Sequence, residues 1–314
     1  MGSPDFALPS LQLLLGAGHE VVLVLSRPDQ PAGRGRVPTP TAVGSFARDR
    51  GLPLETPARL RDPALRQRLE ELRPDLFVVV AYRILPPSLL AVPRLGSINL
   101  HGSLLPAYRG AAPIERAVMD GEATTGLTTF LLEQGVDTGE ILGATELCIG
   151  PDETAGELRE RMSRAGAPLL AASVAAVLEG RALPRRQPEG EYPGAPKLCA
   201  EDRVLRLGET AERVHNQVRA LSPEPGALAQ FRGRQLQVLR TTRVETPREG
   251  PAGRLRREGR RLFLACGAGE VEILELVPAG KRRMEAAAWL AGARLTVDER
   301  LEPAPAVSQP GGAT

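Results

Sequence analysis

The alternation of short apolar runs with helical patterns is the feature that most constrains how this chain can fold. The runs at 21–25, 76–80 and 97–100 are rich in valine, leucine or isoleucine and have the length of β-strands. A helical pattern at 62–72 lies between the first two. Because strands that alternate with helices pair in parallel and carry the helices on their faces, we predict an α/β domain with a mostly parallel sheet.

Farther along the chain the pattern changes twice. The strand-like runs 128–132 and 141–149 flank a loop that contains glycines, and 153–178 has the spacing of one or two helices. Prolines and glycines then dominate 181–200, which we interpret as a linker. This division predicts a first domain over 1–180 and a second domain over 201–314.

The second domain has the pattern of a small β-barrel. A helical stretch at 210–221 is followed by short alternating segments at 235–239, 261–265 and 271–277. Several short strands at such spacing are typical of a barrel. The stretch 232–261 also carries ten arginines against three glutamates, which fits either a polyanion-binding surface or an ordinary solvated face.

The most informative polar residues lie where the run at 97–100 ends. Asn99 and His101 stand two positions apart, so on a strand they point to the same face. In open parallel sheets, ligands bind beyond the carboxyl ends of the strands. Asp137 lies between Gly135 and Gly139, whose flexible backbone allows a carboxylate to be aimed at the same place. A carboxylate orients an imidazole, and an amide donor beside them stabilises an oxyanion, so the three residues suit acyl transfer to an amine.

The residues around this candidate site resemble a known family. "INLHGSLLPAYRGAAPIER" together with "GVDTGE" is similar to the signature of the folate-dependent formyltransferases, in particular of the members that act on methionyl-tRNA. The similarity continues through "GSPDFALPSL", "RPDQPAGRGR", "VVVAYRILP" and "LVPAGKRRM". It implies a Rossmann-like, mostly parallel α/β domain that catalyses formyl transfer, followed by a smaller OB-like β-barrel domain that binds tRNA.

The resemblance also implies a reaction. The formyl group of 10-formyltetrahydrofolate is transferred directly to the α-amine of methionyl initiator tRNA, through a tetrahedral intermediate that carries an oxyanion. By the family's pattern, Asn99 and His101 stabilise this oxyanion, while Asp137 holds His101 and assists removal of the amine proton.

Binding residues follow from the same resemblance. The loop that matches the family's folate-contacting loop contains Ser103, Leu104, Leu105 and Pro106, and the residues that match its pterin pocket are Arg83, Ile84 and Leu85. The long basic connection at 29–40 matches the loop that enters the acceptor end of tRNA, with Arg34, Gly35 and Arg36 as its contacts. Lys197 and Lys281 stand where the resemblance expects lysine, in "APKL" and "PAGK", and Arg254 begins a basic segment that suits RNA phosphates, so we add these three as tRNA-binding residues.

Two departures from the family pattern bear on the fold. Family members begin with an apolar strand, whereas here only Met1 precedes the "GSPDF" turn. We therefore expect the first strand of the domain to be missing and the true start to lie upstream. The family's "AYGxILP" is also one residue shorter here, reading "AYRILP" at 81–86.

Composition argues against several other classes of protein. The longest apolar stretch, 167–178, is too short to span a bilayer, and the beginning of the chain does not resemble a signal peptide. We therefore expect a cytoplasmic protein with no membrane partner, acting as a monomer. Cys148, Cys199 and Cys266 lie far apart with no histidine at ligand spacing, so neither a disulfide framework nor a metal site is expected.

Three alternatives stay open on the sequence alone. A formyltransferase that acts on a small-molecule amine needs the same three reactive residues but not the basic loop around Arg34 and Arg36. A hydrolase of the formyl donor needs only water in place of the amine. An RNA-binding module that has lost catalysis needs none of Asn99, His101 and Asp137.

Overall fold

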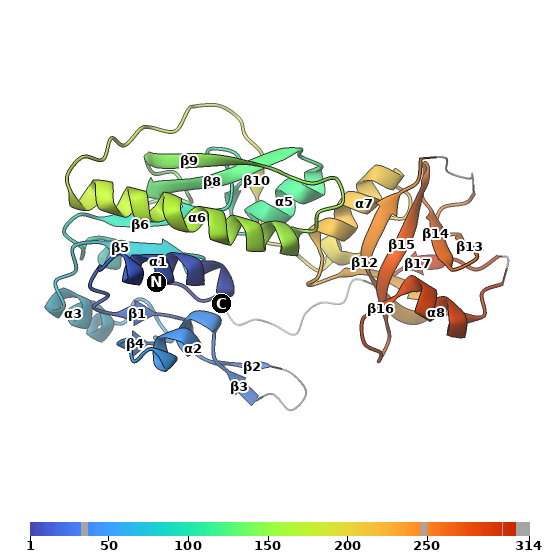
Figure 1. Ribbon diagram of the computed structural model, residues 1–314, viewed down its shortest axis with the longest axis horizontal. Helices are drawn as coiled ribbons and strands as arrows, with labels where there is room; N and C mark the ends of the chain where they lie inside the picture. The colour runs from blue at the N-terminus through green and yellow to red at the C-terminus, as the bar shows by residue number, and fades with distance from the viewer. Residues whose placement is uncertain (33–36, 246–249, 297, 306–314) are drawn as a thin grey trace. The chain divides into compact units, whose positions relative to one another are not determined.

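The computed structural model describes residues 1–32, 37–245, 250–296 and 298–305. The chain divides into two compact units, whose elements are labelled in Figure 1. The first unit consists of Met1–Pro113, Thr124–Cys148 and Arg159–Ala195. The second consists of Ile114–Ala123, Ile149–Leu158 and Pro196–Thr314.

The first unit is built on a four-stranded sheet with the order β5–β6–β8–β9. Its strands are β5 (Phe77–Val80), β6 (Ser97–His101), β8 (Thr124–Leu131) and β9 (Ile141–Cys148). β5 and β6 are parallel, whereas β8 pairs antiparallel with both β6 and β9. β1 and β4 form a separate parallel pair. The predicted α/β class is confirmed, and the antiparallel half of the sheet consists of β8, which lies antiparallel to β6, and β9, which follows β8 as the second strand of a hairpin.

Helix α6 covers this sheet as a single helix. Figure 1 shows it lying along β6 and β8, and Gly166 allows the close approach, because a Cβ there would lie 2.7 Å from Leu100 Cδ2. Ser173 Oγ and Thr129 Oγ1 are hydrogen-bonded at 2.7 Å. α6 (Ala155–Leu178) belongs to the first unit from Arg159 onward. The remaining elements of the first unit are η1 (Asp5–Ala7), α1 (Leu8–Gly16), β1 (Val24–Leu25), β2 (Gln30–Ala32), β3 (Val37–Thr39), α2 (Ala42–Asp49), β4 (Leu54–Glu55), α3 (Pro63–Glu71), α4 (Pro87–Leu90), β7 (Arg109–Gly110) and β10 (Gly194–Ala195).

The strand expected at 21–25 is reduced to Val24 and Leu25. Beside it lies a cavity of about 430 Å³, lined by residues 19–25 and 72–78 among others. Met1 and Gly2 lie between β1 and β5 and bond to both strands. Gly2 N donates to Leu25 O at 3.0 Å, and Val80 N donates to Met1 O at 2.9 Å. Residues 21–23 face this cavity without a ladder partner among the described residues, which explains the shortened strand.

Residues 181–195, expected to form most of a linker, pack on the first unit. Arg185 exchanges two backbone hydrogen bonds with Ile141, at 2.7 and 2.9 Å. β10 then pairs in parallel with β7, placing Gly194 opposite Arg109 and Ala195 opposite Gly110.

The second unit is a curled antiparallel sheet with the order β13–β14–β15–β12–β11–β17. Leu255 N donates to Glu299 O and Leu301 N donates to Gly253 O, both at 2.8 Å. These bonds join the two edge strands, β13 and β17, and the predicted small barrel is confirmed. Its core includes Val218, Val238, Leu264 and Ile273. Its elements are α5 (Pro113–Asp120), η2 (Glu201–Arg203), α7 (Ala211–Ala220), β11 (Ala227–Phe231), β12 (Arg234–Arg243), β13 (Leu255–Glu258), β14 (Arg261–Ala265), β15 (Glu270–Pro278), β16 (Met284–Glu285), α8 (Ala286–Ala293) and β17 (Leu301–Pro303).

Candidate active site

β6 presents Asn99 and His101 on one face, as the two-residue spacing predicts. Asn99 lies opposite Val79 of β5 and Phe130 of β8, so it stands in the middle of the sheet. It is half-buried, and its side-chain amide makes no hydrogen bond to the residues that the structure describes. His101 follows at the end of the strand and is only 7% exposed. The strand end thus holds a free amide donor beside a buried imidazole.

The hydrogen bond of His101 Nε2 fixes the tautomer of the ring. Nε2 lies 2.9 Å from the backbone oxygen of Tyr108. A carbonyl oxygen only accepts, so Nε2 must carry the proton and donate it. In the neutral ring, Nδ1 is therefore the unprotonated nitrogen, available to accept a proton.

Asp137 reaches the same nitrogen from another element. Its Oδ2 lies 3.6 Å from His101 Nδ1 and accepts a hydrogen bond of 2.9 Å from Gly110 N. Asp137 has a φ of 55°, a left-handed conformation that turns its side chain inward from the loop between β8 and β9. The carboxylate, imidazole and amide predicted from the sequence therefore come together in the first unit.

The residues matched to folate binding lie on the loops that follow β5 and β6. Because these strands are parallel neighbours, both loops leave the same edge of the sheet. Ser103 and Leu105 are buried, and Leu85 packs in the core with Leu25 and Phe77. Ile84, by contrast, exposes 81% of its surface.

The others in this set differ in exposure and contacts. Leu104 and Arg83 are half-buried, and Pro106, which follows a cis peptide bond, is buried. Arg83 donates to the backbone oxygens of Ala58 and Pro57, at 3.0 and 2.7 Å.

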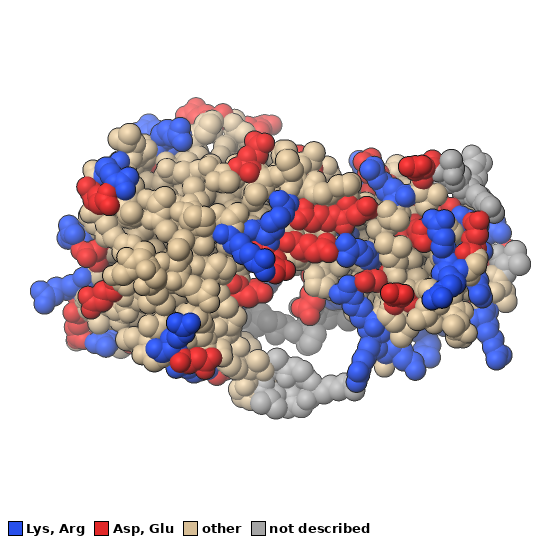
Figure 2. All heavy atoms as spheres, in the orientation of Figure 1, with Lys and Arg blue, Asp and Glu red and all other residues tan. Residues whose placement is uncertain are grey.

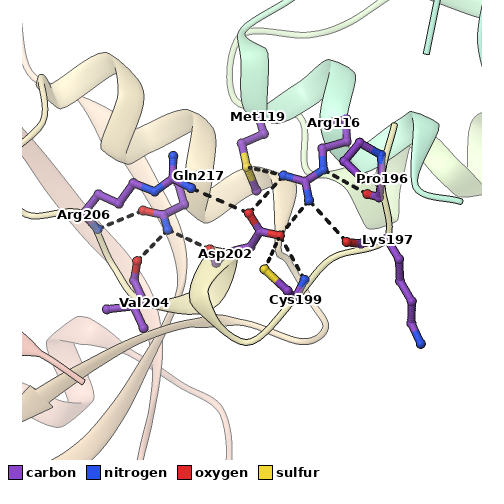
Figure 3. A network of polar contacts seen from close by, with 9 residues as sticks. All are labelled: Arg116, Met119, Pro196, Lys197, Cys199, Asp202, Val204, Arg206 and Gln217. Carbon is purple, nitrogen blue, oxygen red and sulfur yellow. Dashed lines mark hydrogen bonds and ion pairs between the residues drawn. The ribbon is translucent and has the colours of Figure 1, made fainter. Parts of the chain in front are cut away.

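The residues matched to tRNA binding are only partly described. Arg34, Gly35 and Arg36 lie outside the described residues. Lys197 and Lys281 are exposed, and neither ammonium group pairs with a carboxylate within the described ranges. Figure 3 shows the Lys197 side chain pointing away from the polar network around Asp202. Arg254 is half-buried at the start of the barrel sheet.

Part of the positive charge of the arginine-rich stretch 232–261 is neutralised by carboxylates from a neighbouring strand. Arg256 pairs with Glu270 on β15 at 2.7 Å, and Arg261 pairs with Glu272 on the same strand at 2.5 Å. Both guanidinium groups also lie over the ring of Phe263. Figure 2 shows the result on one face of the second unit, where acidic side chains stand among the basic ones.

Four residues of the site were missed by the sequence analysis. Tyr108 and Gly110 supply the backbone groups that bond His101 and Asp137. Arg109 donates to Gln187, which in turn donates to the Asp137 loop. The glycine in "YRGAAP" was the available signal for close backbone approach. Gln187 gave none, because it lies in a stretch whose prolines and glycines indicate a linker.

The described part of the chain brings together no group of three or more histidine, cysteine, aspartate or glutamate side chains that could hold a metal ion. Within the same ranges, no helix combines the length and apolarity that crossing a membrane requires.

Comparisons with known proteins agree on one family. Residues 4–174 match the family described as formyl transferase, and residues 197–294 match its C-terminal domain. The methionyl-tRNA formyltransferase of Acidothermus cellulolyticus is 42% identical, over 96% of this chain and 98% of its own length. That of Heliobacterium modesticaldum is 43% identical, over 94% and 96%.

Solved structures share the fold at lower identity. WlaRD, a sugar 3N-formyl transferase solved in the presence of dTDP and 5-N-formyl-THF, is 16% identical with a TM-score of 0.67, over 90% of this chain and 97% of its own. HypX from Aquifex aeolicus in complex with tetrahydrofolic acid is 17% identical with a TM-score of 0.59, over 78% of this chain and 43% of its own.

Proposed function

This chain belongs to the formyl transferase family, and we propose that it transfers the formyl group of 10-formyltetrahydrofolate to the α-amine of methionyl initiator tRNA. The observation that carries this proposal is the pairing of His101 with Asp137 at a strand end that also presents Asn99. The high identity to methionyl-tRNA formyltransferases over nearly the whole chain supports tRNA as the acceptor.

Asn99 stabilises the negative charge that develops on the formyl oxygen. Its amide has no protein acceptor among the described residues, so an N–H is available to donate. A donor aimed at a developing oxyanion contributes about 10²- to 10³-fold in rate.

We assign His101 to proton transfer instead of the oxyanion role that the family's pattern implies, because its Nε2–H is already donated to the Tyr108 oxygen. When bound, the folate supplies a formyl carbon that the methionyl amine attacks. The amine nitrogen first forms a bond to that carbon, which gives the tetrahedral oxyanion. The bond to the folate nitrogen breaks when this intermediate collapses, so one proton must leave the amine. His101 Nδ1 is the unprotonated nitrogen and accepts it. Asp137, 3.6 Å away, stabilises the charged imidazolium until the proton passes to the leaving nitrogen.

The folate is assigned to the two loops at the carboxyl edge of β5 and β6. Ile84 is an exposed apolar side chain that a flat pterin ring would cover, which supports the fit of this edge to the donor. Leu85, Ser103 and Leu105 are buried, so we assign them backbone contacts, together with Arg83, Leu104 and Pro106.

Charged tRNA is assigned to basic groups of both units. Lys197 and Lys281 are exposed without an ion pair in the described part of the chain, and Arg254 lies on the barrel. Arg34, Gly35 and Arg36 are assigned from the sequence pattern. We further propose that the enzyme acts in the cytoplasm as a monomer, because a single chain supplies every group named for the reaction.

The alternatives differ in their acceptor. Structural likeness to sugar formyltransferases at 16% identity supports only a shared fold, whereas the 42% and 43% identities to methionyl-tRNA formyltransferases over nearly the whole chain favour methionyl-tRNA as the acceptor. A hydrolase would release formate, and a binding module would release nothing.

The test is transfer of labelled formyl from 10-formyltetrahydrofolate to three acceptors in parallel: methionyl initiator tRNA, a nucleotide-linked amino sugar, and water. We expect label on the methionyl amine at a kcat/KM at least about 10²-fold above that for the sugar. Label found mainly on the sugar or as formate would overturn the proposal.

A further inference from the structure

Residues 185–195, here called the strap, hold the element that fixes His101 and Asp137. The strap bonds to β9 through Arg185, and three successive residues, 193–195, bond to β7 and to Tyr108, which precedes it. Tyr108 N donates to Pro193 O at 2.6 Å, and Gly194 and Ala195 pair with Arg109 and Gly110. Both backbone groups that bond the catalytic pair, Tyr108 O and Gly110 N, therefore lie on a segment that the strap holds in place.

Gln187 extends this support to the Asp137 loop itself. Its Oε1 accepts from Arg109 Nε at 3.1 Å and from Arg109 Nη2 at 2.6 Å. Its Nε2 donates to the backbone oxygens of Asp137 and Gly139, both at 2.8 Å. One half-buried amide thus makes four hydrogen bonds that tie together β7, the strap and the catalytic loop.

The orientation of the Gln187 amide follows from its partners. A guanidinium only donates and backbone oxygens only accept, so Oε1 must face Arg109 and Nε2 must face the loop. A flipped amide, or a carboxylate in its place, sets an acceptor against two carbonyl oxygens. The position therefore requires glutamine chemistry rather than merely a polar side chain of that size.

The loop that Gln187 holds is tightly constrained. Asp137 is left-handed, and a Cβ on Gly139 would lie 1.7 Å from Leu131 O. Gln187 bonds the carbonyl on each side of Thr138. It therefore fixes the backbone of this loop and, with it, the position of the Asp137 carboxylate relative to His101.

We propose that Gln187 is a positioning residue for formyl transfer, acting through Asp137 to keep the carboxylate against His101 Nδ1. This inference rests on the proposed function. A misplacement of about 1 Å in a reacting group costs about 10²-fold in rate. Loss of Gln187 thus lowers kcat while leaving the surfaces that bind folate and tRNA unchanged.

Three variants test this proposal: Gln187→Leu, which removes all four bonds; Gln187→Glu, which keeps the acceptor for Arg109 but loses both donors; and Gln67→Leu, a control on the exposed face of α3. We expect kcat for methionyl-tRNA to fall about 10- to 100-fold in both Gln187 variants, with KM for either substrate changing less than about threefold. Gln67→Leu should match the parent enzyme.

A double-mutant cycle with Asp137→Asn separates positioning from a purely structural role. If Gln187 acts through Asp137, Gln187→Leu has little further effect on kcat once the carboxylate is gone. Equal fold-losses in the two backgrounds, or a kcat for Gln187→Glu equal to that of the control, overturn the inference. Absence of formyl transfer by the parent enzyme would instead overturn the proposed function. If Gln187→Leu does not fold, Gln187→Glu carries the same cycle.

Discussion

At the scale of single residues, the chemistry depends on which atom of each side chain faces the reaction. His101 Nε2 donates to the Tyr108 oxygen, and Gly110 N donates to the Asp137 carboxylate. His101 Nδ1 is left without a hydrogen bond to any residue that the structure describes, and Oδ2 of Asp137, the oxygen that accepts from Gly110 N, lies 3.6 Å from it. On this arrangement we base the proposal that proton transfer occurs at Nδ1 and that Asn99 donates to the oxyanion.

Replacement of Asp137 by asparagine tests this division of roles. The variant keeps an oxygen for Gly110 N but loses the charge that stabilises the imidazolium. We expect kcat to fall about 10²-fold or more, with the affinity for tRNA unchanged. The measurement is steady-state formylation together with tRNA binding. A kcat within about threefold of the parent would contradict a role for the Asp137 charge.

At the scale of secondary-structure elements, two local contacts are important: the β7–β10 strand pair beside the site in the first unit, and the ion pair between α5 and η2 in the second. β7 and β10 are only two residues each, yet Gly110 of β7 donates to Asp137, and Tyr108, which immediately precedes β7, accepts from His101. In the second unit, α5 is tied to η2 by Arg116, which binds both carboxylate oxygens of Asp202, at 3.0 and 2.6 Å (Figure 3). Asp202 also accepts from Cys199 N at 2.9 Å.

Gly110→Ala tests the β7–β10 pair. Gly110 has a φ of 130°, and a Cβ there would lie 2.3 Å from Ala195 O, so the pair must open. We expect a loss of about 2 kcal/mol or more in unfolding free energy, and a fall in kcat because Asp137 loses its donor. Gly194→Ala on the facing strand is the matched control, since its Cβ comes no nearer than 4.0 Å to another chain atom. Similar losses in both variants would contradict this account.

Arg116→Met tests the α5–η2 tie through its pH dependence. Burial raises the pKa of Asp202, but the hydrogen bonds from Arg116 and Cys199 outweigh it and lower the pKa to about 2. Since the unfolded chain titrates near about 4, this stabilisation is complete above pH 4 and disappears as the pH falls toward 2. We expect Arg116→Met to cost about 3 kcal/mol at pH 7 and clearly less at pH 2, measured by urea unfolding.

Arg206→Met is the control for that measurement. Arg206 contacts the same carboxylate at 3.6 Å from an exposed position, where an ion pair contributes about 0.5 kcal/mol or less. An equal loss in the two variants, or a loss for Arg116→Met that does not depend on pH, would contradict the proposed tie.

Elements with strong periodicity were predictable, and elements defined by their partners were not. β6 and α3 follow directly from apolar runs and helical spacing, and the i, i+2 relation of Asn99 and His101 survives in the fold. The strand expected at 21–25 was mostly wrong because a strand needs a neighbour, and residues 21–23 face a cavity. Gln187 was hidden because hydrogen bonds to backbone carbonyls leave no pattern in the sequence.

At the scale of the whole molecule, binding of charged tRNA depends on charges that are not neutralised within the protein. Counting arginines along 232–261 overstated this charge, because Glu270 and Glu272, which pair with Arg256 and Arg261, lie farther along the chain. Lys197 and Lys281 have no such partners in the described ranges and are the better candidates.

Lys281→Ala tests that assignment. Loss of one phosphate contact should weaken tRNA binding and reduce the slope of log affinity against log salt by about 0.7 to 0.9. Arg94→Ala is the control, because Arg94 is a surface cation of the first unit already paired with Asp75 at 2.8 Å. The measurement is a salt titration of tRNA binding. An unchanged slope for Lys281→Ala would remove Lys281 from the RNA interface.

The most direct test of the whole account is the single-turnover rate of formyl transfer by Asn99→Ala, measured with saturating 10-formyltetrahydrofolate and methionyl-tRNA. If Asn99 donates to the formyl oxygen while His101 takes the proton, the rate falls about 10²- to 10³-fold and tRNA affinity stays at the parent value. A rate equal to the parent's, with tRNA bound normally, would contradict the claim that this strand end is the catalytic centre.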